Sequence, residues 1–494
     1  MFAHPPSKTR PFRTARASAR LAGLLAASML GGCLVGPNYQ RPAVETPPAF
    51  KEAEGWTPAQ PADGLDRGDW WTIFNDALLN SLETKVEVSN QNLAAALAAY
   101  EQAHAVVAAD QAQLFPTVDL TGSATQSKQG SRGGTGTGTG TAGATGRATT
   151  SYQLQVGASW ALDVWGKIRR QVEGAKASAQ ASAADLANAR LSAQSTLAVD
   201  YLELRLLDAQ KAVLRATVDG DAKALTVVSN QYNAGTVPKS DELQAETTLD
   251  NAKASLVDLD SQRAASEHAI AVLTGVPPAD LTIAPDPNWA PSVPETPIDV
   301  PSTLLERRPD IASSERLAQA ANAQIGVQTA GYFPDITLSG DYGFASSGLS
   351  GLLNASNAFW SIGANAVETV FNAGQTSALV REAKASRDQA FANYRQTVLT
   401  AFQQVEDDLA AARVLQTEEP LRLAASQAAD QGETVALNEY RAGTVDYTTV
   451  VTAQNAALSA RQTLLDLRVQ RMTTAVTLIE ALGGGWSASQ LPKS

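Results

Sequence analysis

Two different spacings of hydrophobic residues alternate along this chain. In residues 152–162 every second residue is apolar and the intervening ones are mostly polar or small, which is the spacing of a β-strand with one apolar face. The same alternation covers residues 360–366 and, over shorter stretches, residues 118–121 and 336–342. The sequence therefore predicts four strands, each about the length of a tilted membrane-spanning strand or shorter.

The second spacing is helical and unusually long. Residues 168–232 contain no proline, and a continuous helix over them would be roughly 98 Å long. Apolar residues there fall at coiled-coil spacing among many alanines, and residues 391–409 repeat the pattern. Return helices are expected over 243–273 and 451–479. Pro420 should kink or interrupt the second long helix, because it removes an amide donor and clashes with the preceding turn.

An internal repeat organises these elements. Residues 232–237 (YNAGTV) recur as 440–445 (YRAGTV), an offset of 208, and the Phe-Pro pair at 115–116 recurs at 333–334, an offset of 218. The difference of ten residues between these two offsets is explained by a Gly/Thr run in the first copy. The predicted organisation is a signal peptide (1–32), an extended proline-rich arm (33–65), repeat 1 (66–275), a linker (276–303), repeat 2 (304–483) and a C-terminal tail (484–494).

The beginning of the chain has the features of a lipoprotein signal. Five cations precede an apolar run of about ten residues, which is too short to span a bilayer. The sequence Leu30-Gly-Gly-Cys33 then resembles the bacterial lipobox, and Cys33 is the one cysteine of the chain. A covalent lipid such as palmitate on Cys33 is therefore expected, and Leu34 after it favours the outer membrane. The alternative is a chance cysteine beside a signal.

Composition excludes several functions. The net charge is -12, and removal of residues 1–32 with their five cations would leave -17, which argues against a nucleic-acid partner. His104 and His268 lie in alanine-rich helical sequence, and the catalytic motifs of metalloproteases, hydrolases and redox enzymes are missing. The GxGxxG match at 138–143 lies in the Gly/Thr run and reads as a loop. We predict no enzyme, no catalytic residue, no metal site and no cofactor besides the lipid.

The four strands raise a closure problem. If they span a membrane, four strands from one chain cannot close a barrel, and an open sheet edge is not tolerated in lipid. The protein must then form an oligomer. Three chains would supply twelve strands around a water-filled lumen, whereas two would give eight, a barrel that side chains nearly fill. The alternative is an ordinary sheet on a soluble core, which the long helices disfavour.

Several short motifs together resemble those of the TolC-like outer-membrane efflux factors, in the lipoprotein (NodT/OprM-like) branch that works with resistance-nodulation-division (RND) pumps. The matching segments are 33–39, 41–42, 70–79, 304–311 and the paired Ala-Gly-Thr turns. The resemblance implies a mixed, mainly α fold: a homotrimer with a twelve-stranded outer-membrane β-barrel continued by a periplasmic α-helical coiled-coil barrel. It also implies contact with outer-membrane lipid, a periplasmic adaptor protein and an inner-membrane RND pump.

The resemblance also assigns roles to residues at the helix turns. The tip motifs that would dock the adaptor are Ala234, Gly235, Thr236, Val237, Ala442, Gly443, Thr444 and Val445. Family members often carry gate aspartates six or nine residues after the second glycine, where this chain has Thr449 and Thr452. In the first copy Asp241 and Glu242 are the gate candidates, and solvated carboxylates at a helix start are the plain alternative.

Two functional hypotheses follow. The first is a passive outer-membrane channel of a tripartite efflux system, which opens at its periplasmic end by untwisting near Gly235 and Gly443. The second is a lipid-anchored periplasmic coiled-coil adaptor or structural lipoprotein, which has no need for strands with a lipid-facing side. The sequence leaves open whether the substrate is a drug, a metal or a metabolite.

Overall fold

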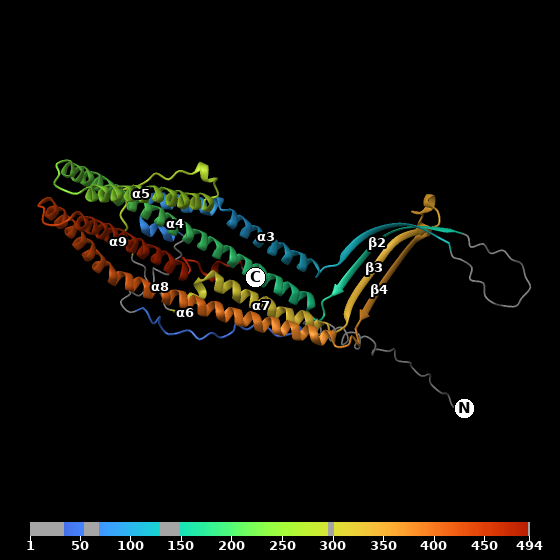
Figure 1. Ribbon diagram of the computed structural model, residues 1–494. Helices are drawn as coiled ribbons and strands as arrows, with labels where there is room; N and C mark the ends of the chain where they lie inside the picture. Colours follow the sequence, from blue (N-terminus) through green and yellow to red (C-terminus); the bar gives the residue numbers. More distant parts are fainter. Residues whose placement is uncertain (1–33, 54–68, 129–147, 295–300, 493–494) are drawn as a thin grey trace, which may run out of the picture. The chain divides into compact units, whose positions relative to one another are not determined.

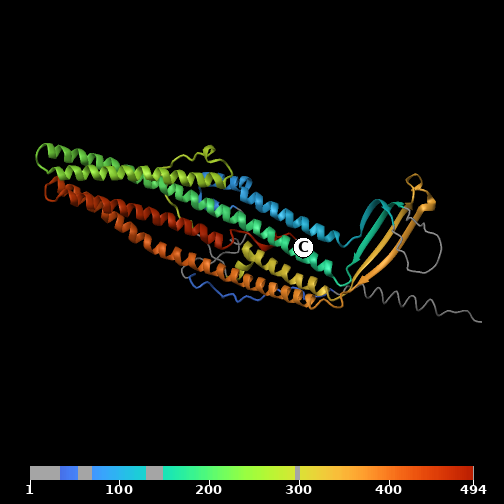
Figure 2. The ribbon, with the colours of Figure 1, turned by 45° about the vertical axis from the view of Figure 1, so that its right-hand side comes forward.

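The computed structural model describes residues 34–53, 69–128, 148–294 and 301–492 (Figures 1 and 2). The predicted signal peptide, Cys33 and the 138–143 loop lie outside these residues. The main elements in chain order are α2 Ala77–Ser89, α3 Gln91–Ala112, β1 Thr117–Ser127, β2 Thr149–Leu162, α4 Lys167–Asn233, α5 Lys239–Leu273, α6 Pro301–Arg307, α7 Pro309–Ala330, β3 Asp335–Ser346, β4 Ala358–Val367, α8 Gln375–Arg441 and α9 Tyr447–Ala481.

The helices reproduce the internal repeat. Helices α4 and α8 each have 67 residues, and α5 and α9 each have 35. The offset of 208 residues maps both ends of α4 onto α8 and both ends of α5 onto α9. In both views of the molecule α4 lies beside α5, and α8 beside α9 (Figures 1 and 2). The two predicted structural repeats are therefore confirmed, and the return helices begin four residues earlier than expected.

The predicted interruption at Pro420 is wrong. Helix α8 runs through Pro420, which is exposed, so water can satisfy the carbonyl group that loses its amide partner. The neighbouring Glu419 accepts a hydrogen bond from Arg468 of α9 at 2.9 Å and a second one from Arg471. These contacts hold α9 against α8 beside the proline, where the ladder of helical hydrogen bonds is weakest.

The chain divides into two compact units. One contains residues up to 41, 103–179 and 317–390, and its centre is a four-stranded antiparallel sheet in the order β1-β2-β3-β4. The register aligns Leu120, Val156, Tyr342 and Trp360 in one row across the sheet. The adjacent row contains Asp119, Gly157, Asp341 and Ser361. The apolar positions of all four strands therefore share one face, as their alternation predicts.

The other unit contains residues 42–102, 180–316 and 391–494 and consists mainly of helices. Its largest hydrophobic cluster joins α2, α4 and the end of α9, with Trp71, Leu82, Tyr201 and Val476 among its members. The arm runs along α8 as an extended segment whose Phe50 packs edge-to-face on Phe402, with ring centroids 6.5 Å apart. Its proline content explains why it forms no helix.

Candidate functional site

The two helix turns predicted as tips have the same backbone structure. Gly235 and Gly443 adopt φ angles of +73° and +74°, and a Cβ at either would meet nothing within 4 Å. Glycine is therefore required by the backbone conformation and not by lack of space. The following threonine completes the cap, because the backbone amide and the hydroxyl of Thr236 both donate to the Gln231 carbonyl at 2.9 Å.

The second turn repeats this cap with the same geometry. Both donor groups of Thr444 reach the Glu439 carbonyl at 3.0 Å. Ala234 and Ala442 directly follow the ends of α4 and α8, and these alanines, the glycines and the threonines are all exposed. The structure thus presents three residues of each predicted docking motif at the surface. The docking role itself remains a prediction.

The fourth residue of each motif lies in a different environment. Val237 and Val445 are half-buried and pack on a small hydrophobic cluster that also contains Val228, Tyr440 and Tyr447. The rings of Tyr440 and Tyr447 meet edge-to-face at 5.3 Å, and the Tyr440 hydroxyl donates to Gln231 Oε1 at 2.9 Å. The valines therefore join the two turns into one packed tip.

Of the two gate candidates in repeat 1, Glu242 is already neutralised locally. It pairs with Lys239 and accepts a hydrogen bond from Ser229 at 2.9 Å, and these contacts hold its pKa below the usual range. Asp241 is half-exposed in the first turn of α5, and its charge contributes to raising the pKa values of Tyr440 and Tyr447, which burial raises most. Asp241 accepts a hydrogen bond from the neighbouring Ser240 hydroxyl at 3.3 Å, whereas Glu242 is paired with a lysine, so Asp241 is the stronger gate candidate.

In repeat 2 the two threonines serve the helix itself. The Thr452 hydroxyl donates to the Thr448 carbonyl at 2.8 Å, whereas the amide and hydroxyl of Thr449 donate to Asp446 Oδ1 at 3.0 and 2.7 Å. The hydroxyl and amide of Thr449 lower the pKa of Asp446, the N-cap of α9. The sequence reasoning missed Asp446, although an aspartate directly before the first residue of a helix is a common N-cap signal.

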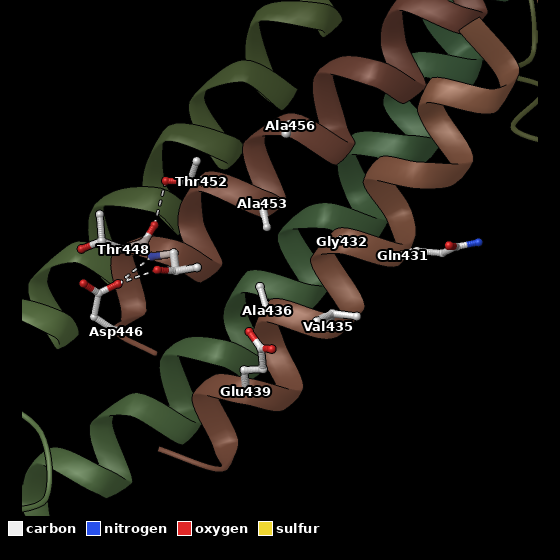
Figure 3. Close-up of a pocket in the computed structure, with 11 residues that line it drawn as sticks. Gln431, Gly432, Val435, Ala436, Glu439, Asp446, Thr448, Thr452, Ala453 and Ala456 are labelled. Carbon is white, nitrogen blue, oxygen red and sulfur yellow. Dashed lines mark hydrogen bonds between the residues drawn. The ribbon is translucent and has the colours of Figure 1, made fainter. Parts of the chain in front are cut away.

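A groove of about 670 Å³ lies beside Asp446. Its lining comes from the last turns of α8 and the first turns of α9 (Figure 3). Gly432, Ala436, Ala453 and Ala456 are the small residues of the lining, and Glu439 and Asp446 contribute the carboxylates. Small residues allow a helix of another molecule to approach closely, and the lining contains no cation. The groove therefore combines small residues with two carboxylates.

Polar contacts cross between the helices behind the tip. Gln210 of α4 donates to Asp466 of α9 at 2.7 Å, and Arg461 of α9 binds Asp430 and Glu433 of α8 at 2.8 and 2.9 Å. Burial, with the charge of Glu433 as a second cause, raises the pKa of Asp221 on α4 to about 6. The interface between α4 and α8 thus contains a carboxyl group that titrates in mildly acidic medium.

The residues that follow Cys33 are firmly held. Arg170, whose side chain is 1 % exposed, donates to the Val35 and Gly36 carbonyls at 3.1 and 3.2 Å and to Asn38 Oδ1 at 2.8 Å. Asn322 donates to the Pro37 carbonyl at 3.0 Å. The start of the arm is therefore fixed on α4 and α7 of the unit that contains the sheet.

Comparison with known proteins shows which family this protein belongs to. The family model described as outer membrane efflux protein matches residues 84–276 and 300–484, which together form most of the chain. The chain belongs to the outer membrane efflux protein family. Both matched segments contain a strand pair, a long helix, a tip turn and a return helix, so the family match covers both repeats.

Individual relatives agree over nearly the whole length. The solvent efflux pump outer membrane protein SrpC of Pseudomonas putida is 31% identical over 484 residues, covering 94% of this chain and 98% of the relative. The cation efflux system protein CusC of Escherichia coli is 28% identical over 474 residues, covering 94% and 99%. The solved structure of the outer-membrane channel OprN superimposes with a TM-score of 0.84 at 29% identity, covering 92% and 100%.

These matches identify the protein as an outer-membrane efflux channel with a periplasmic helical extension. The function predicted from the resemblance is confirmed, and the adaptor alternative is not supported. The relatives are named as channel and efflux proteins rather than enzymes. Within the described residues there is no group of metal-binding side chains, and no helix there has the length and apolar character needed to cross a membrane.

Proposed function

We propose that three copies of this chain close one twelve-stranded barrel in the outer membrane. The observation that carries the proposal is the sheet: four strands with one continuous apolar face and, in the described part of the chain, no partner for the outer side of β1 or β4. Such edges are unfavourable in lipid, so the sheet needs further strands. Three copies supply enough strands for an aqueous lumen, which two copies do not.

The helical unit would then form the periplasmic tunnel, with the tips directed toward an adaptor and an inner-membrane RND pump. The exposed Ala-Gly-Thr turns and the groove beside Asp446 support docking at this end. Asp241 supports a gate, because three copies around an axis would give a ring of carboxylates that attracts cations. We assign Glu242 to shaping the tip because its carboxylate pairs with Lys239, and Thr449 and Thr452 because their uncharged hydroxyls bond within the start of α9.

Cys33 is proposed as the lipid attachment site. The clamp around Arg170 supports this, because it holds Val35 and Asn38, which follow the cysteine in the sequence, on the unit that contains the sheet. Lipid and barrel would then enter the same membrane. Metabolic labelling with a palmitate analogue should label the full chain and not the Cys33→Ala variant. Equal labelling of both proteins would contradict the assignment.

The substrate is left to the pump in this proposal. The name of SrpC refers to solvents and that of CusC to cations, yet the identities of both to this chain differ by only a few per cent. Overall similarity therefore does not select a substrate class.

Charge substitution on the two sheet faces tests the barrel. Ile362→Arg places a charge on the apolar face, where Ile362 is 82 % exposed in the single chain, at a cost of about 2–4 kcal/mol per copy in mid-membrane. Ser361→Arg, the matched control, places the same charge on the polar face. We expect loss of trimer mass and of planar-bilayer conductance for the first variant only. A folded protein with unchanged mass and conductance after Ile362→Arg would overturn the barrel.

The groove is tested separately by filling it. Ala453→Trp should abolish efflux in cells while native mass and bilayer conductance remain, because the channel is intact but the partner cannot seat. Asn455→Trp, on an exposed position of α9 outside the groove lining, is the control. Normal efflux with Ala453→Trp would remove the groove from the docking surface.

A further inference from the structure

The outer strands of the sheet determine how neighbouring copies can meet. Strand β1 has 11 residues, all exposed, and β4 has 10 residues, nearly all exposed. The chain directions alternate along the sheet, so β4 of one copy would lie antiparallel to β1 of the next. This inference rests on the proposed trimer, but the trimer leaves the register at the seam between copies undetermined.

The two faces of the sheet impose the first constraint. Trp360 and Ile362 lie on the apolar face with Leu120, whereas Ser361 lies on the polar face with Asp119. A slip of one residue at the seam would turn every side chain of one strand to the wrong face. Apolar-face residues of β4 must therefore stand opposite apolar-face residues of β1, which allows only every second register.

Threefold symmetry and strand tilt impose the second constraint. Following paired residues once around the barrel leads back to the first strand at a position displaced by a number of residues, the total stagger. Each copy contributes the same even displacement, so the total stagger takes values of roughly 6, 12 or 18 residues. With a rise of about 3.3 Å per residue and strands about 4.8 Å apart, these values correspond to tilts of roughly 19°, 35° and 46°. Barrels of this type tilt by about 35–45°, which excludes the smallest value.

The strand ends select between the two remaining registers. We propose that Val367 of each copy stands opposite Thr117 of the next copy, and Ala358 opposite Gln126. All ten residues of β4 are then paired within β1, and the total stagger is roughly 12 residues. The other remaining register, with a total stagger of roughly 18 residues, is shifted by two residues. It leaves Ala358 beyond the end of β1 and sets the apolar-face Trp360 opposite Gln126.

Side-chain sizes on the apolar face fit the proposed register. It sets Ile362 opposite Gly122, and the space over Gly122 is open, with only Leu154 Cδ1 within 4 Å at 3.7 Å. Trp360, which is 72 % exposed in the single chain, meets Ala124, and Leu120 meets Ala364. Each large residue therefore stands opposite a small one, as close packing of cross-strand pairs requires.

The polar face is also complementary in this register. Asp119 stands opposite Asn365, whose amide group can donate to the carboxylate across the seam. Ser123 stands opposite Ser361, and two hydroxyl groups can form a hydrogen bond with each other. In the register shifted by two residues Asp119 would instead face Val367, which offers no donor from its side chain.

Disulfide trapping tests the register. The pair Ser123→Cys with Ser361→Cys places the two cysteines opposite each other at the seam, within the separation that a disulfide needs. Inside one copy β1 and β4 are separated by two strands, roughly 14 Å, so any bond between the two sites joins different copies. After oxidation we expect loss of the monomer band on a denaturing gel and a covalent trimer that reducing agent dissolves.

Matched pairs make the outcome specific. Thr125→Cys with Ser361→Cys tests the register shifted by two residues, and each single variant controls for bonding through Cys33. Stronger trapping of the Thr125 pair, or no trapping of either pair in a protein of trimer mass, would overturn the register while the channel proposal stands. A monomer mass for the reduced proteins and the parent chain alike would overturn the trimer itself.

A volume exchange gives a second test that needs no new cysteine. Gly122→Val should lower the melting temperature of the trimer, because the added side chain meets Ile362 of the next copy. Ile362→Ala in the same chain should restore it. Ile336→Ala, on the same face but away from the seam, should not. Equal rescue by both alanine variants would contradict the predicted contact.

Discussion

The two tip turns share one backbone and differ in chemistry. Gly235 and Gly443 have φ angles within one degree of each other, and the same threonine cap follows each. The residues after the caps differ: α5 begins after Pro238 without a side-chain cap, whereas Asp446 caps α9. The difference teaches that the shared residues of the repeated motif set the backbone of the turn, whereas the residues that start the following helix differ in charge and in capping.

The first residue of each return helix should give the largest difference between the two repeats. Tyr447 is 2 % exposed and packs on Tyr440, whereas its counterpart Lys239 lies partly exposed on Tyr232. Tyr447→Ala should reduce the free energy of local opening at the tip by about 3–5 kcal/mol, and Lys239→Ala by less than about 0.5 kcal/mol. Hydrogen exchange of the amides between 436 and 451 measures the first effect, and that of the equivalent amides between 228 and 243 measures the second. Similar losses in the two variants would show that the repeats are equally rigid.

A second contrast lies at Glu83 of α2, because the repeat offset places Pro301 at the equivalent position. Glu83 is fully buried, neither carboxylate oxygen has a hydrogen-bond partner in the described protein, and burial raises its pKa to about 9. A raised pKa means that the folded protein binds the extra proton. The contribution of the protonated Glu83 carboxyl to the free energy of unfolding is therefore complete below the pKa of the unfolded state and is lost as the pH rises through about 9.

Glu83→Gln should consequently stabilise the protein at pH 7 by about 3 kcal/mol, because the cost of protonation disappears. The melting temperature should rise at neutral pH and depend less on pH between 5 and 9. Solvent-exposed Glu87→Gln on the same helix is the control. A lower melting temperature for Glu83→Gln at pH 7 would indicate that the ionised carboxylate has a favourable partner.

The helix caps should give a smaller contrast. Asp446→Ala removes the acceptor for the Thr449 amide and should cost about 1 kcal/mol at the start of α9. Pro238→Ala, at the equivalent position of repeat 1, removes no side-chain hydrogen bond and should change local exchange little. Asp446→Asn should recover most of the loss. Identical exchange rates in the two alanine variants would contradict the assigned cap.

The smallest effect concerns pH at the interface between the repeats. Asp221 has a pKa raised to about 6, mainly by burial, and its counterpart in repeat 2 is Ala429. Since the folded pKa is raised, the contact between α4 and α8 should loosen as pH rises from about 4 through 6. Asp221→Asn should remove this slope in tip hydrogen exchange. A slope that persists in the variant would assign the titration to another group.

Much of this fold was predictable because its signals are local. The alternation in residues 152–162 found β2, and the proline-free run found α4 to within one residue at each end. Both turns followed from the repeated Ala-Gly-Thr. The interruption predicted at Pro420 does not occur, since an exposed proline in a long packed helix leaves a carbonyl that water can satisfy and packing with α9 continues past it.

The candidate site was less predictable because its members belong to different elements. Asp241 and Glu242 are adjacent in the sequence and equally suitable as gate residues, yet Glu242 is the one that pairs with Lys239 and accepts a hydrogen bond from Ser229. Asp446 lies directly before α9 and caps it, but it is not at either of the positions where family members carry gate aspartates. The Arg170 clamp joins the arm to α4 across more than a hundred residues, and no local pattern connects them.

The sequence by itself determined the period-two strands, the long helices, the repeat and the turn residues, because each depends on backbone preferences and side-chain spacing within a few residues. Only the tertiary structure decided which face each strand shares, which carboxylates keep their charge, and where the groove lies. These properties depend on register, burial and partners brought together from distant positions, and electrostatic and packing energies arise only when those partners meet.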